Sequence, residues 1–400
     1  MKGVASSSTL DQLHQRLVVQ ESMDRRRRLK PSLLSGTDII DEKGVRRVNF
    51  SGNDYLGVVA DRLLDDLDDT SSTGPDHGAT ASSLVCGWSP LHETLADRIA
   101  EMEQTESAVV MPSGYAACSG AVATLAAEGD AILSDSLNHA SLIDGCRLSA
   151  AQTVVVPHRD VNFADDFLNR HRGDYTSIWI VTDSVFSMDG TLAPLDDWIG
   201  VAQRHDAMLM VDEAHATGVL GKRGSGLCEA TENRDSIPIR IGTLSKAIGC
   251  QGGFVAGPRV VIDNLIQSCR PLIFSTALSP ALAEAACRIV DELPRMGTRR
   301  SRLASLARRV RDRLGLPAGS KLESGVPIVP VVMGSDASAL RASEVLADAG
   351  YFAPAIRPPT VPEGAARVRV SISAAHGDDQ VDGLIEVLAS VLPQSHGVQG

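Results

Sequence analysis

The chain has 400 residues, of which 43% are hydrophobic and 22% are charged, a composition typical of a folded protein with a large core. The net charge of -12 and the pI near 5.3 argue against a surface that binds nucleic acid or an anionic membrane. The first twenty residues lack the apolar block of a secretory signal, so we expect a cytoplasmic protein.

Residues 1–50 are predicted to form an N-terminal arm. The arm is polar and partly helical up to about residue 30, and it contains the basic run Arg25–Arg28. A charge run of this kind usually lies on a solvated face. The phrase VNFSGNDYLG, residues 48–57, then predicts a short strand and a turn.

Residues 51–288 are predicted to form a large α/β domain. Its first helix is expected over Ser89–Gln104, with Ser89 as the cap and Pro90 in the first turn. The uncharged window Ser107–Ala127 is better explained by a strand, a turn and a buried helix than by a membrane span. Short apolar runs follow in alternation with helical patterns, and several are continuous, which is typical of a mostly parallel sheet covered by helices. The runs are SAVVMPS, DAILSD, TVVVPH, SIWIVTDS, AMLMVDEA, IRIGTLSK and GGFVAG.

Residues 289–400 are predicted to form a smaller α+β domain. It contains a basic helical stretch over Arg299–Leu314, the strand VPIVPVVMG, a helix over Ser338–Ala349 and the strand RVRVSISAAH. The arginines of the first helix are expected to lie on a solvated face rather than to bind RNA, because the whole chain is acidic.

The seven cysteines are scattered along the chain and form no C-x-x-C pair. An odd number without metal-ligand spacing indicates core thiols in a reducing compartment, and neither a disulfide framework nor a metal site is expected.

The phrase VDEAHATG, residues 211–218, places two acids and a histidine directly after an apolar run. A nucleotide-driven helicase would also need an upstream phosphate-binding loop of the form G-x-x-x-x-G-K-[ST], and the chain has none. Asp212, Glu213 and His215 are too close in sequence to form a metal site of the H-E-x-x-H kind.

A second phrase, IGTLSKAIG, places Lys246 after a strand in a turn rich in small and hydroxyl residues. A lysine in a semi-buried pocket loses its proton more easily and can bond covalently to an aldehyde. Pyridoxal 5'-phosphate (PLP) needs such a lysine, an acid for its ring nitrogen and donors for its phosphate. The combination of Lys246 and Asp212 therefore indicates a PLP enzyme.

At this point the sequence resembles the α-oxoamine synthases, PLP enzymes of fold type I, over nearly its whole length. The phrases that carry the resemblance are NDYLG, LNHASL, DSVFSMDG, VDEAHATG, TLSKAIG, LIFSTALSP and IRPPTVP, in family order. Within the family, IRPPTVP followed by RVRVSISAAH is most similar to the branch of the 8-amino-7-oxononanoate synthases, which serves biotin biosynthesis.

The resemblance implies a role for each matched residue. Lys246 would hold the cofactor covalently and move the substrate Cα proton, Asp212 would pair with the ring nitrogen, and His139 would stack on the ring. His215 and Ser187 would lie near the phenolic oxygen. The expected phosphate ligands are the backbone of Ser113, Gly114 and Tyr115, the Thr243 hydroxyl, and Ser275 and Thr276 acting on the neighbouring subunit. Arg357 would hold the amino-acid carboxylate, and Asn53 would face the substrate. One arginine of the basic run, with Arg26 as the candidate, would contact the acyl-CoA.

The implied activity is a decarboxylative condensation of an amino acid with an acyl-CoA in a homodimer with shared active sites. For the biotin branch the substrates would be L-alanine and pimeloyl-CoA. Glycine C-acetyltransferase, with glycine and acetyl-CoA, is the nearest alternative; an aldolase or aminotransferase and a non-catalytic subunit of the same fold are further ones. One segment departs from the family pattern: HGATASSLVCG, residues 77–87, has fewer glycines and no arginine, which leaves the acyl group open.

Overall fold

The computed structural model describes residues 7–23, 25–65 and 77–392; the other residues of the predicted N-terminal arm and of the C-terminus lie outside this part. Contacts within the chain divide it into two compact units. Unit 1 comprises Met1–Ser51, Pro330–Val370 and Asp382–Gly400, and unit 2 comprises Gly52–Val329 and Ser371–Val381. Both ends of the chain thus contribute to unit 1, and the three-part division stays a prediction.

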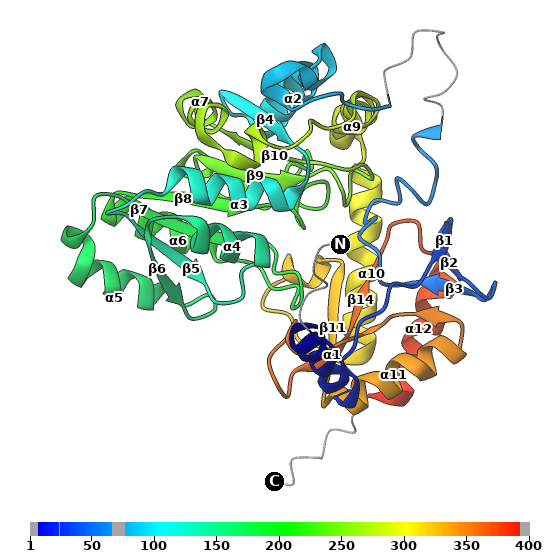
Figure 1. Cartoon of the computed structure of the whole chain (residues 1–400). Coiled ribbons are helices and arrows are strands. Elements are labelled where there is room, and N and C mark those ends of the chain that lie inside the picture. The colour runs from blue at the N-terminus through cyan, green and yellow to red at the C-terminus, as the bar shows by residue number, and fades with distance from the viewer. Residues whose placement is uncertain (1–6, 24, 66–76, 393–400) are drawn as a thin grey trace. The chain divides into compact units, whose positions relative to one another are not determined.

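Unit 2 contains a seven-stranded sheet in the order β4-β10-β9-β8-β7-β5-β6 (Figure 1). Only β10 runs antiparallel to its neighbours, so the predicted mostly parallel sheet is confirmed. All seven apolar runs singled out in the sequence form these strands. Their bounds are β4 Ser107–Met111, β5 Ala131–Asp135, β6 Gln152–Val156, β7 Ile178–Asp183, β8 Ala207–Asp212, β9 Ile239–Thr243 and β10 Gly253–Gly257.

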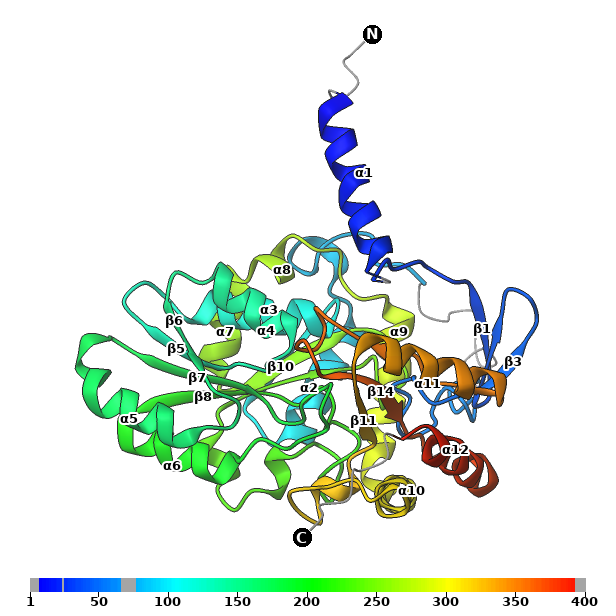
Figure 2. The ribbon, with the colours of Figure 1, turned by 90° about the horizontal axis from the view of Figure 1, so that it is seen from below.

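Helices cover both faces of this sheet. Figure 2 shows α3 and α4 on one side of the strands and α5 and α6 on the other. The strands β5 and β7 are buried along their whole length, whereas Val155 on the edge strand β6 is exposed. The α-helices of unit 2 are α2 Pro90–Glu103, α3 Gly114–Leu125, α4 Ala140–Leu148, α5 Val161–His171, α6 Leu195–His205, α7 Arg259–Ser268, α8 Arg270–Ile273, α9 Pro280–Glu292 and α10 Gly297–Leu314. Short turns of helix lie at Ser83–Gly87, Arg172–Asp174, Cys228–Ala230, Arg234–Ser236, Leu293–Arg295 and Glu323–Gly325.

The helix predicted from Ser89 to Gln104 is confirmed as α2. Ser89 is its N-cap, and the Ser89 backbone N–H donates to His92 Nδ1 at 3.1 Å. The uncharged window after it forms β4, a turn and the buried helix α3, as predicted. Among the described residues, no helix combines the length and the apolar character needed to cross a membrane.

The basic helix α10 differs from the expectation of a solvated face, because two of its arginines are buried. Arg311 donates to the backbone carbonyls of Val326 and Ile328 at 2.8 and 2.6 Å, and Arg300 donates to the carbonyl of Leu293 at 2.6 Å. Burial lowers the pKa of Arg311 to about 10. These guanidinium groups fix neighbouring loops, which a charge pattern alone does not reveal.

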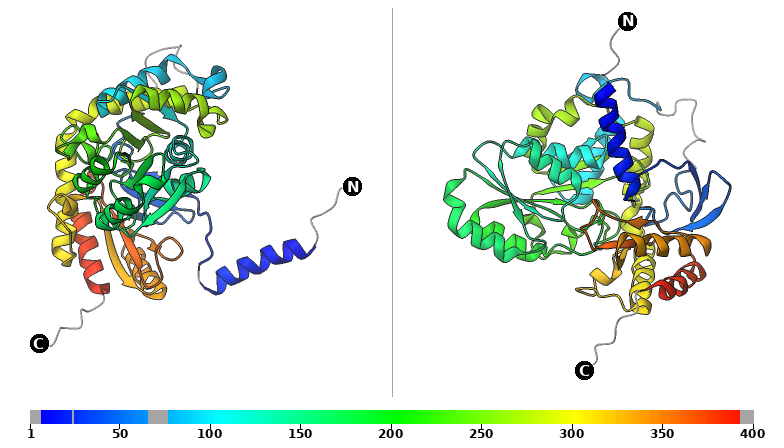
Figure 3. Two further views of the ribbon diagram at one scale, coloured as in Figure 1. Left: turned by 90° about the vertical axis from the view of Figure 1, so that its left-hand side faces the viewer. Right: turned by 60° about the horizontal axis from the view of Figure 1, so that its bottom comes forward.

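Unit 1 joins the two ends of the chain. The strand β3 pairs in parallel with β12, and Arg47 Nε donates to the carbonyl of Ala347 in α11 at 3.0 Å. Figures 1 and 3 show the blue N-terminal strands beside the orange helix α11. The elements centred on this unit are α1 Ser7–Ser22, β1 Ser32–Ser35, β2 Asp38–Asp41, β3 Arg46–Asn49, β11 Ile328–Gly334, α11 Asp336–Asp348, β12 Tyr351–Phe352, β13 Ala355–Ile356, β14 Ala366–Ser371 and α12 Asp378–Val391.

Candidate active site

Polar side chains end four strands of the large sheet at one edge. The last residues of β5, β7, β8 and β9 are Asp135, Asp183, Asp212 and Thr243. Because β5, β7, β8 and β9 are parallel, their carboxyl ends lie together, and open α/β sheets bind ligands outside this edge. The sequence-predicted residues His139 and Lys246 follow β5 and β9 by only a few positions.

Asp212, the acid for which the sequence predicts a catalytic role, is buried, with 3% of its surface exposed. Its Oδ1 accepts a hydrogen bond from the Ala214 backbone N–H at 2.8 Å, and its Oδ2 accepts one from the Cys118 thiol at 3.0 Å. Two donors at fixed positions, one to each oxygen, restrict the rotation of this carboxylate. The strand end therefore presents an oriented carboxylate.

His139 caps helix α4 beside this acid. Its backbone N–H donates to Asp183 Oδ2 at 2.6 Å, and its Nδ1 lies 2.7 Å from the Ser141 hydroxyl. His139 is exposed on one side. The surrounding protein nevertheless removes water from the imidazole and thereby lowers its pKa. The charge of Asp212 opposes this change, and the charge of Lys246 adds to it. The charges of Asp212 and Lys246 thus both act on the imidazole, so His139 is not a core histidine.

Lys246 lies partly buried in a tight loop between β9 and β10. The loop is closed by the Leu244 backbone N–H, which donates to the Gly252 carbonyl at 3.0 Å, and by the Thr243 hydroxyl, which donates to the same carbonyl at 2.9 Å. The charge of Lys246 also lowers the pKa of Asp183, although burial and Asp212 raise it more strongly. The ammonium therefore belongs to the same cluster as Asp183, Asp212 and His139.

The start of α3 approaches the end of β9 very closely. Ser113 is the N-cap, and its hydroxyl accepts a hydrogen bond from the Ala116 backbone N–H at 3.1 Å. A Cβ built at Gly114 would lie 3.0 Å from the Thr243 hydroxyl oxygen, so only glycine leaves open the space between the helix start and Thr243. The first N–H groups of a helix, here those of Gly114 and Tyr115, have no acceptor within the helix and suit an anion. The Tyr115 side chain itself is exposed and hydrogen-bonds Asp144.

His215 belongs to a second polar group in unit 2. Its Nδ1 lies 2.7 Å from the Tyr55 hydroxyl, and this hydroxyl donates to Asn53 Oδ1 at 3.0 Å. Tyr55 is fully buried, and His215 is 5% exposed. Ser187 is half-buried in the segment that follows β7. The structure thus joins Asn53 and His215, two residues predicted separately from the sequence, through a tyrosine.

The second acid of VDEAHATG has a structural role. The Glu213 carboxylate accepts hydrogen bonds from the backbone N–H groups of Leu227 at 3.0 Å and Cys228 at 2.6 Å. A Cβ at Gly226 would lie 2.6 Å from the Glu213 carboxyl carbon, so the loop needs glycine there. Glu213 therefore fixes the glycine-rich loop, while Asp212 and His215 remain at the strand end.

Ser275 and Thr276 lie away from these groups in sequence, after helix α8. Thr276 is exposed and pairs with Ser82, and the Ala277 backbone N–H donates to the Ala81 carbonyl at 3.0 Å. The segment FSTALSP thus packs against HGATASSLVCG, the segment that departs from the family pattern. Within the described part of the chain, no hydrogen bond joins Ser275 or Thr276 to Asp212, His139 or Lys246.

Arg357 and Arg26 belong to unit 1. Arg357 follows the strand β13, whose Ile356 pairs with Arg367 of β14. Arg26 is exposed, and its Nη1 lies 3.0 Å from Glu21 Oε2. Their roles toward the substrate stay predictions.

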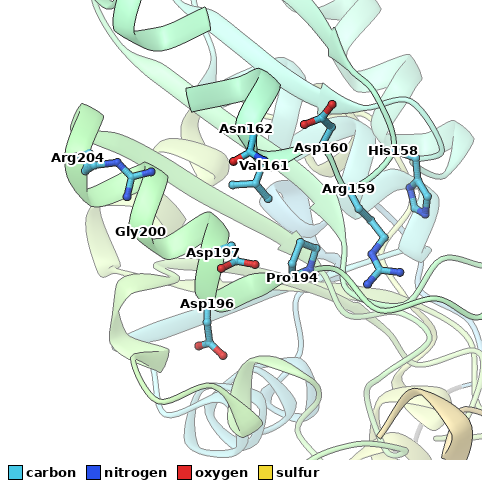
Figure 4. A pocket seen from close by; sticks show the side chains of 10 residues that line it. All are labelled: His158, Arg159, Asp160, Val161, Asn162, Pro194, Asp196, Asp197, Gly200 and Arg204. Carbon is cyan, nitrogen blue, oxygen red and sulfur yellow. The ribbon is translucent and has the colours of Figure 1, made fainter. Parts of the chain in front are cut away.

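A separate cavity of about 750 Å³ lies between the starts of α5 and α6 (Figure 4). It includes none of the residues predicted to form the site. Charges of both signs surround it, and Arg204, at one end of the cavity in Figure 4, is paired with Asp165 at 2.9 Å. The lining residues are His158, Arg159, Asp160, Val161, Asn162, Pro194, Asp196, Asp197, Gly200 and Arg204. Asp212, His139 and Lys246 therefore do not line this cavity.

Sequence reasoning missed four residues that the structure adds to the site: Tyr55, Cys118, Ser141 and Asp183. Tyr55, Ser141 and Asp183 occur inside the phrases NDYLG, LNHASL and DSVFSMDG, yet a phrase does not say which side chains meet. Cys118 follows Gly114 by four residues, which places both on one face of a helix. In the sequence, this spacing is the sign that the Cys118 thiol lies on the same helix face as Gly114.

Comparisons with known proteins give a consistent result. Residues 46–388 match the family described as aminotransferase class I and II. An 8-amino-7-oxononanoate synthase of Anaeromyxobacter dehalogenans (strain 2CP-1) is 41% identical, over 96% of this chain and 96% of its own length.

Two solved structures are similar over most of the chain. Serine palmitoyltransferase from S. paucimobilis, solved with PLP and myriocin bound, has a TM-score of 0.87 and 27% identity, and the match covers 97% of this chain and 98% of that one. An 8-amino-7-oxononanoate synthase from Francisella tularensis has a TM-score of 0.68 and 25% identity, over 86% of this chain and 97% of that one.

Proposed function

Because the chain belongs to the α-oxoamine synthases, PLP-dependent acyltransferases of fold type I within the aminotransferase class I and II family, we propose that it condenses L-alanine with pimeloyl-CoA. The products would be 8-amino-7-oxononanoate, CoA and CO₂, as in biotin biosynthesis. The observation that carries the proposal is the cluster of Asp212, His139 and Lys246 at the carboxyl ends of β8, β5 and β9. The identity to relatives of that name supports the choice of substrates.

The residues present fit PLP. The open space that Gly114 leaves beside Thr243, together with the N–H groups at the start of α3, suits its phosphate. The buried Asp212 suits its ring nitrogen, and the exposed side of His139 suits its flat face. When bound, PLP supplies an aldehyde for the amino group of the substrate and a protonated ring that accepts the electron pair of the Cα–H bond.

Lys246 has two tasks in this proposal. Its Nζ holds the cofactor until the amino acid arrives, and it then removes the Cα proton and later returns one. Asp212 would pair with the ring nitrogen, and the two hydrogen bonds to its oxygens fix the orientation of its carboxylate. Ser187 and His215 would lie near the phenolic oxygen, and the Tyr55 hydroxyl holds the His215 imidazole in place.

By the resemblance to the family, Arg357 would bind the amino-acid carboxylate through its planar guanidinium, and Asn53 would face the substrate. A guanidinium that holds a carboxylate with two parallel hydrogen bonds fixes the orientation of the amino acid, which saves the entropy of a freely rotating substrate. Arg26 or one of its basic neighbours contacts the acyl-CoA, whose phosphates are negative.

The active protein in this proposal is a cytoplasmic homodimer. Ser275 and Thr276 then act on the phosphate in the neighbouring subunit, which agrees with the exposure of Thr276 in the single chain. Sedimentation of the PLP-loaded protein tests this assembly. A fully active monomer would contradict it.

A second candidate keeps the chemistry and changes the acyl donor. The altered segment HGATASSLVCG packs against FSTALSP and carries the exposed side chains of Leu84 and Val85. The similarity to a serine palmitoyltransferase structure also favours a family member with a longer acyl chain. Glycine with acetyl-CoA is the other alternative, against which the phrase IRPPTVP argues.

The experiment compares release of free CoA thiol by the PLP-loaded protein for L-alanine with pimeloyl-CoA, L-serine with palmitoyl-CoA, and glycine with acetyl-CoA. Release with the first pair alone is the expected result. Release with only the second or third pair would replace the proposed substrates by those of another branch. If none of the three pairs releases free CoA thiol, the protein does not use these acyl donors.

A further inference from the structure

A buried thiol contacts the carboxylate that we assign to the ring nitrogen. Cys118 Sγ donates to Asp212 Oδ2 at 3.0 Å, and the two residues are only 2% and 3% exposed. The other carboxylate oxygen accepts from Ala214 N–H. Each oxygen of Asp212 therefore has one donor within the protein, and the donor to Oδ2 is a side chain.

Ser141 is a further buried group near the thiol. It is 1% exposed, its side chain opposes the rise in the Cys118 pKa, and its hydroxyl lies 2.7 Å from His139 Nδ1. Ser141 therefore contacts the residue expected on the cofactor ring face, while Cys118 contacts the residue expected at the ring nitrogen.

Helix α3 brings this thiol to the site from the same face that serves the phosphate. Gly114 and Cys118 are four residues apart, so they lie one above the other, separated by about 6 Å along the helix axis. The start of α3 faces Thr243, while the next turn reaches Asp212. One rigid helix therefore sets both the phosphate end and the ring-nitrogen end of the site.

The sulfur keeps its proton at neutral pH. Burial raises the pKa of the Cys118 thiol well above its usual range, and the charge of Asp212 raises it further. A thiol is a weak donor, so it can orient a carboxylate while leaving that carboxylate able to bind a stronger donor.

We propose that Cys118 is a positioning residue for the cofactor: its thiol fixes the orientation in which the Asp212 carboxylate faces the ring nitrogen. This inference rests on the proposed function, in which Asp212 pairs with the ring nitrogen. Cys118 itself touches neither substrate nor ring.

The test uses Cys118→Ala, Cys118→Ser and the control Cys269→Ala, a buried cysteine of the same core cluster. The first readout is the dissociation constant of PLP for each apoprotein, and the second is the pH at which the absorbance of the bound cofactor changes. We expect Cys118→Ala to weaken PLP binding roughly two- to tenfold and to shift the spectral pH, since one hydrogen bond is lost. Cys118→Ser keeps a donor and should restore both values, and Cys269→Ala should match the wild type.

A third readout needs no cofactor. The infrared S–H stretching band of the apoprotein should contain a component at lowered frequency that disappears in Cys118→Ala and moves in Asp212→Asn. The inference is overturned if Cys118→Ala equals the wild type in affinity and spectral pH, or if Cys118→Ser is as impaired as Cys118→Ala. If Asp212→Asn itself leaves PLP affinity and spectrum unchanged, the assignment of Asp212 fails, and the proposed function fails with it.

Discussion

Asp183 and Asp212 end the neighbouring parallel strands β7 and β8 and stand opposite one another in the strand register. Burial and then the charge of Asp212 raise the pKa of the Asp183 carboxyl well above its usual range. The two acids also have different hydrogen-bond donors. Asp183 Oδ2 accepts from the His139 backbone N–H, whereas the Asp212 oxygens accept from the Cys118 thiol and the Ala214 backbone N–H. We therefore expect different roles for the two acids.

The first prediction concerns this difference. Asp183→Asn should lower kcat by less than about tenfold, because an amide oxygen can still accept the hydrogen bond from the His139 N–H. Asp212→Asn should lower kcat by about 10²–10³-fold, the usual cost of removing a charge stabiliser. Steady-state kinetics on both variants check this. Equal losses would show that the two acids do not have separate roles.

The second prediction concerns Lys246. Lys246→Ala should lower kcat by at least about 10²-fold, because the group that moves the Cα proton is lost. Borohydride treatment of the wild type should attach the cofactor to the peptide that contains Lys246, as mass spectrometry can detect. Lys222→Ala, which changes an exposed lysine of the same unit, should behave as the wild type. Attachment at another lysine would contradict the assignment.

The third prediction concerns Tyr55. Tyr55→Phe removes the hydroxyl that lies 2.7 Å from His215 Nδ1 and leaves the ring in the core. The loss of this contact and of the hydrogen bond to Asn53 Oδ1 should lower kcat/KM by roughly tenfold. Tyr175→Phe, a half-buried tyrosine outside the site, serves as the control. Full activity of Tyr55→Phe would show that His215 needs no support from this hydroxyl.

The fourth prediction concerns Arg357. Arg357→Lys should raise the KM for the amino acid by roughly tenfold or more and change the KM for the acyl-CoA little, because a lysine cannot bind a carboxylate with two parallel hydrogen bonds. Arg341→Lys on α11 changes an exposed arginine and should alter neither constant. A rise only in the KM for the acyl-CoA would show that Arg357 binds the acyl-CoA and not the amino acid.

The fifth prediction concerns Glu103, a buried acid between Arg234 and Arg240, whose guanidinium groups lie 3.5 and 3.9 Å away. Burial and then Glu213 raise the pKa of Glu103 to about 8 from 4.5, against the opposing effect of the two arginines. The folded state therefore binds more protons between these pH values. The contribution of protonated Glu103 to the stability of the fold is therefore complete below pH 4.5, and it is lost as the pH rises through 8.

The free energy of unfolding should accordingly fall with pH in this window, by at most about 1.4 kcal/mol per pH unit. Urea unfolding of the wild type and Glu103→Gln at several pH values checks this, with the exposed Glu101→Gln on the same helix as control. The stability difference between wild type and Glu103→Gln should shrink or reverse as the pH rises. Parallel curves would contradict the raised pKa.

The sequence predicted the strands of unit 2 well because buried parallel strands are continuous apolar runs, as in β7. It could not predict that β3 pairs with β12, since no local pattern records a contact between the two ends of the chain. The sequence also did not predict the burial of Arg300 and Arg311. A charged residue on a helix is expected to face solvent, and the backbone carbonyls that accept its hydrogen bonds are known only from the structure.

For the site, the sequence predicted Asp212, His139 and Lys246, and the structure brings these three together. The resemblance supplied their roles, whereas residues and spacing alone gave only a lysine and an acid suited to PLP. The link between Asp212 and Cys118 depends on the distance between a strand end and a helix face. Such a distance exists only after folding, so it had to come from the structure.

The most direct test of the central claim uses L-alanine labelled with ¹³C in the carboxyl group, supplied with pimeloyl-CoA to the PLP-loaded protein. A decarboxylative condensation releases one labelled CO₂ for each free CoA thiol, and neither should appear with Lys246→Ala. Release of CoA without labelled CO₂ would mean hydrolysis or simple acyl transfer to the amino group, and it would contradict the proposed function.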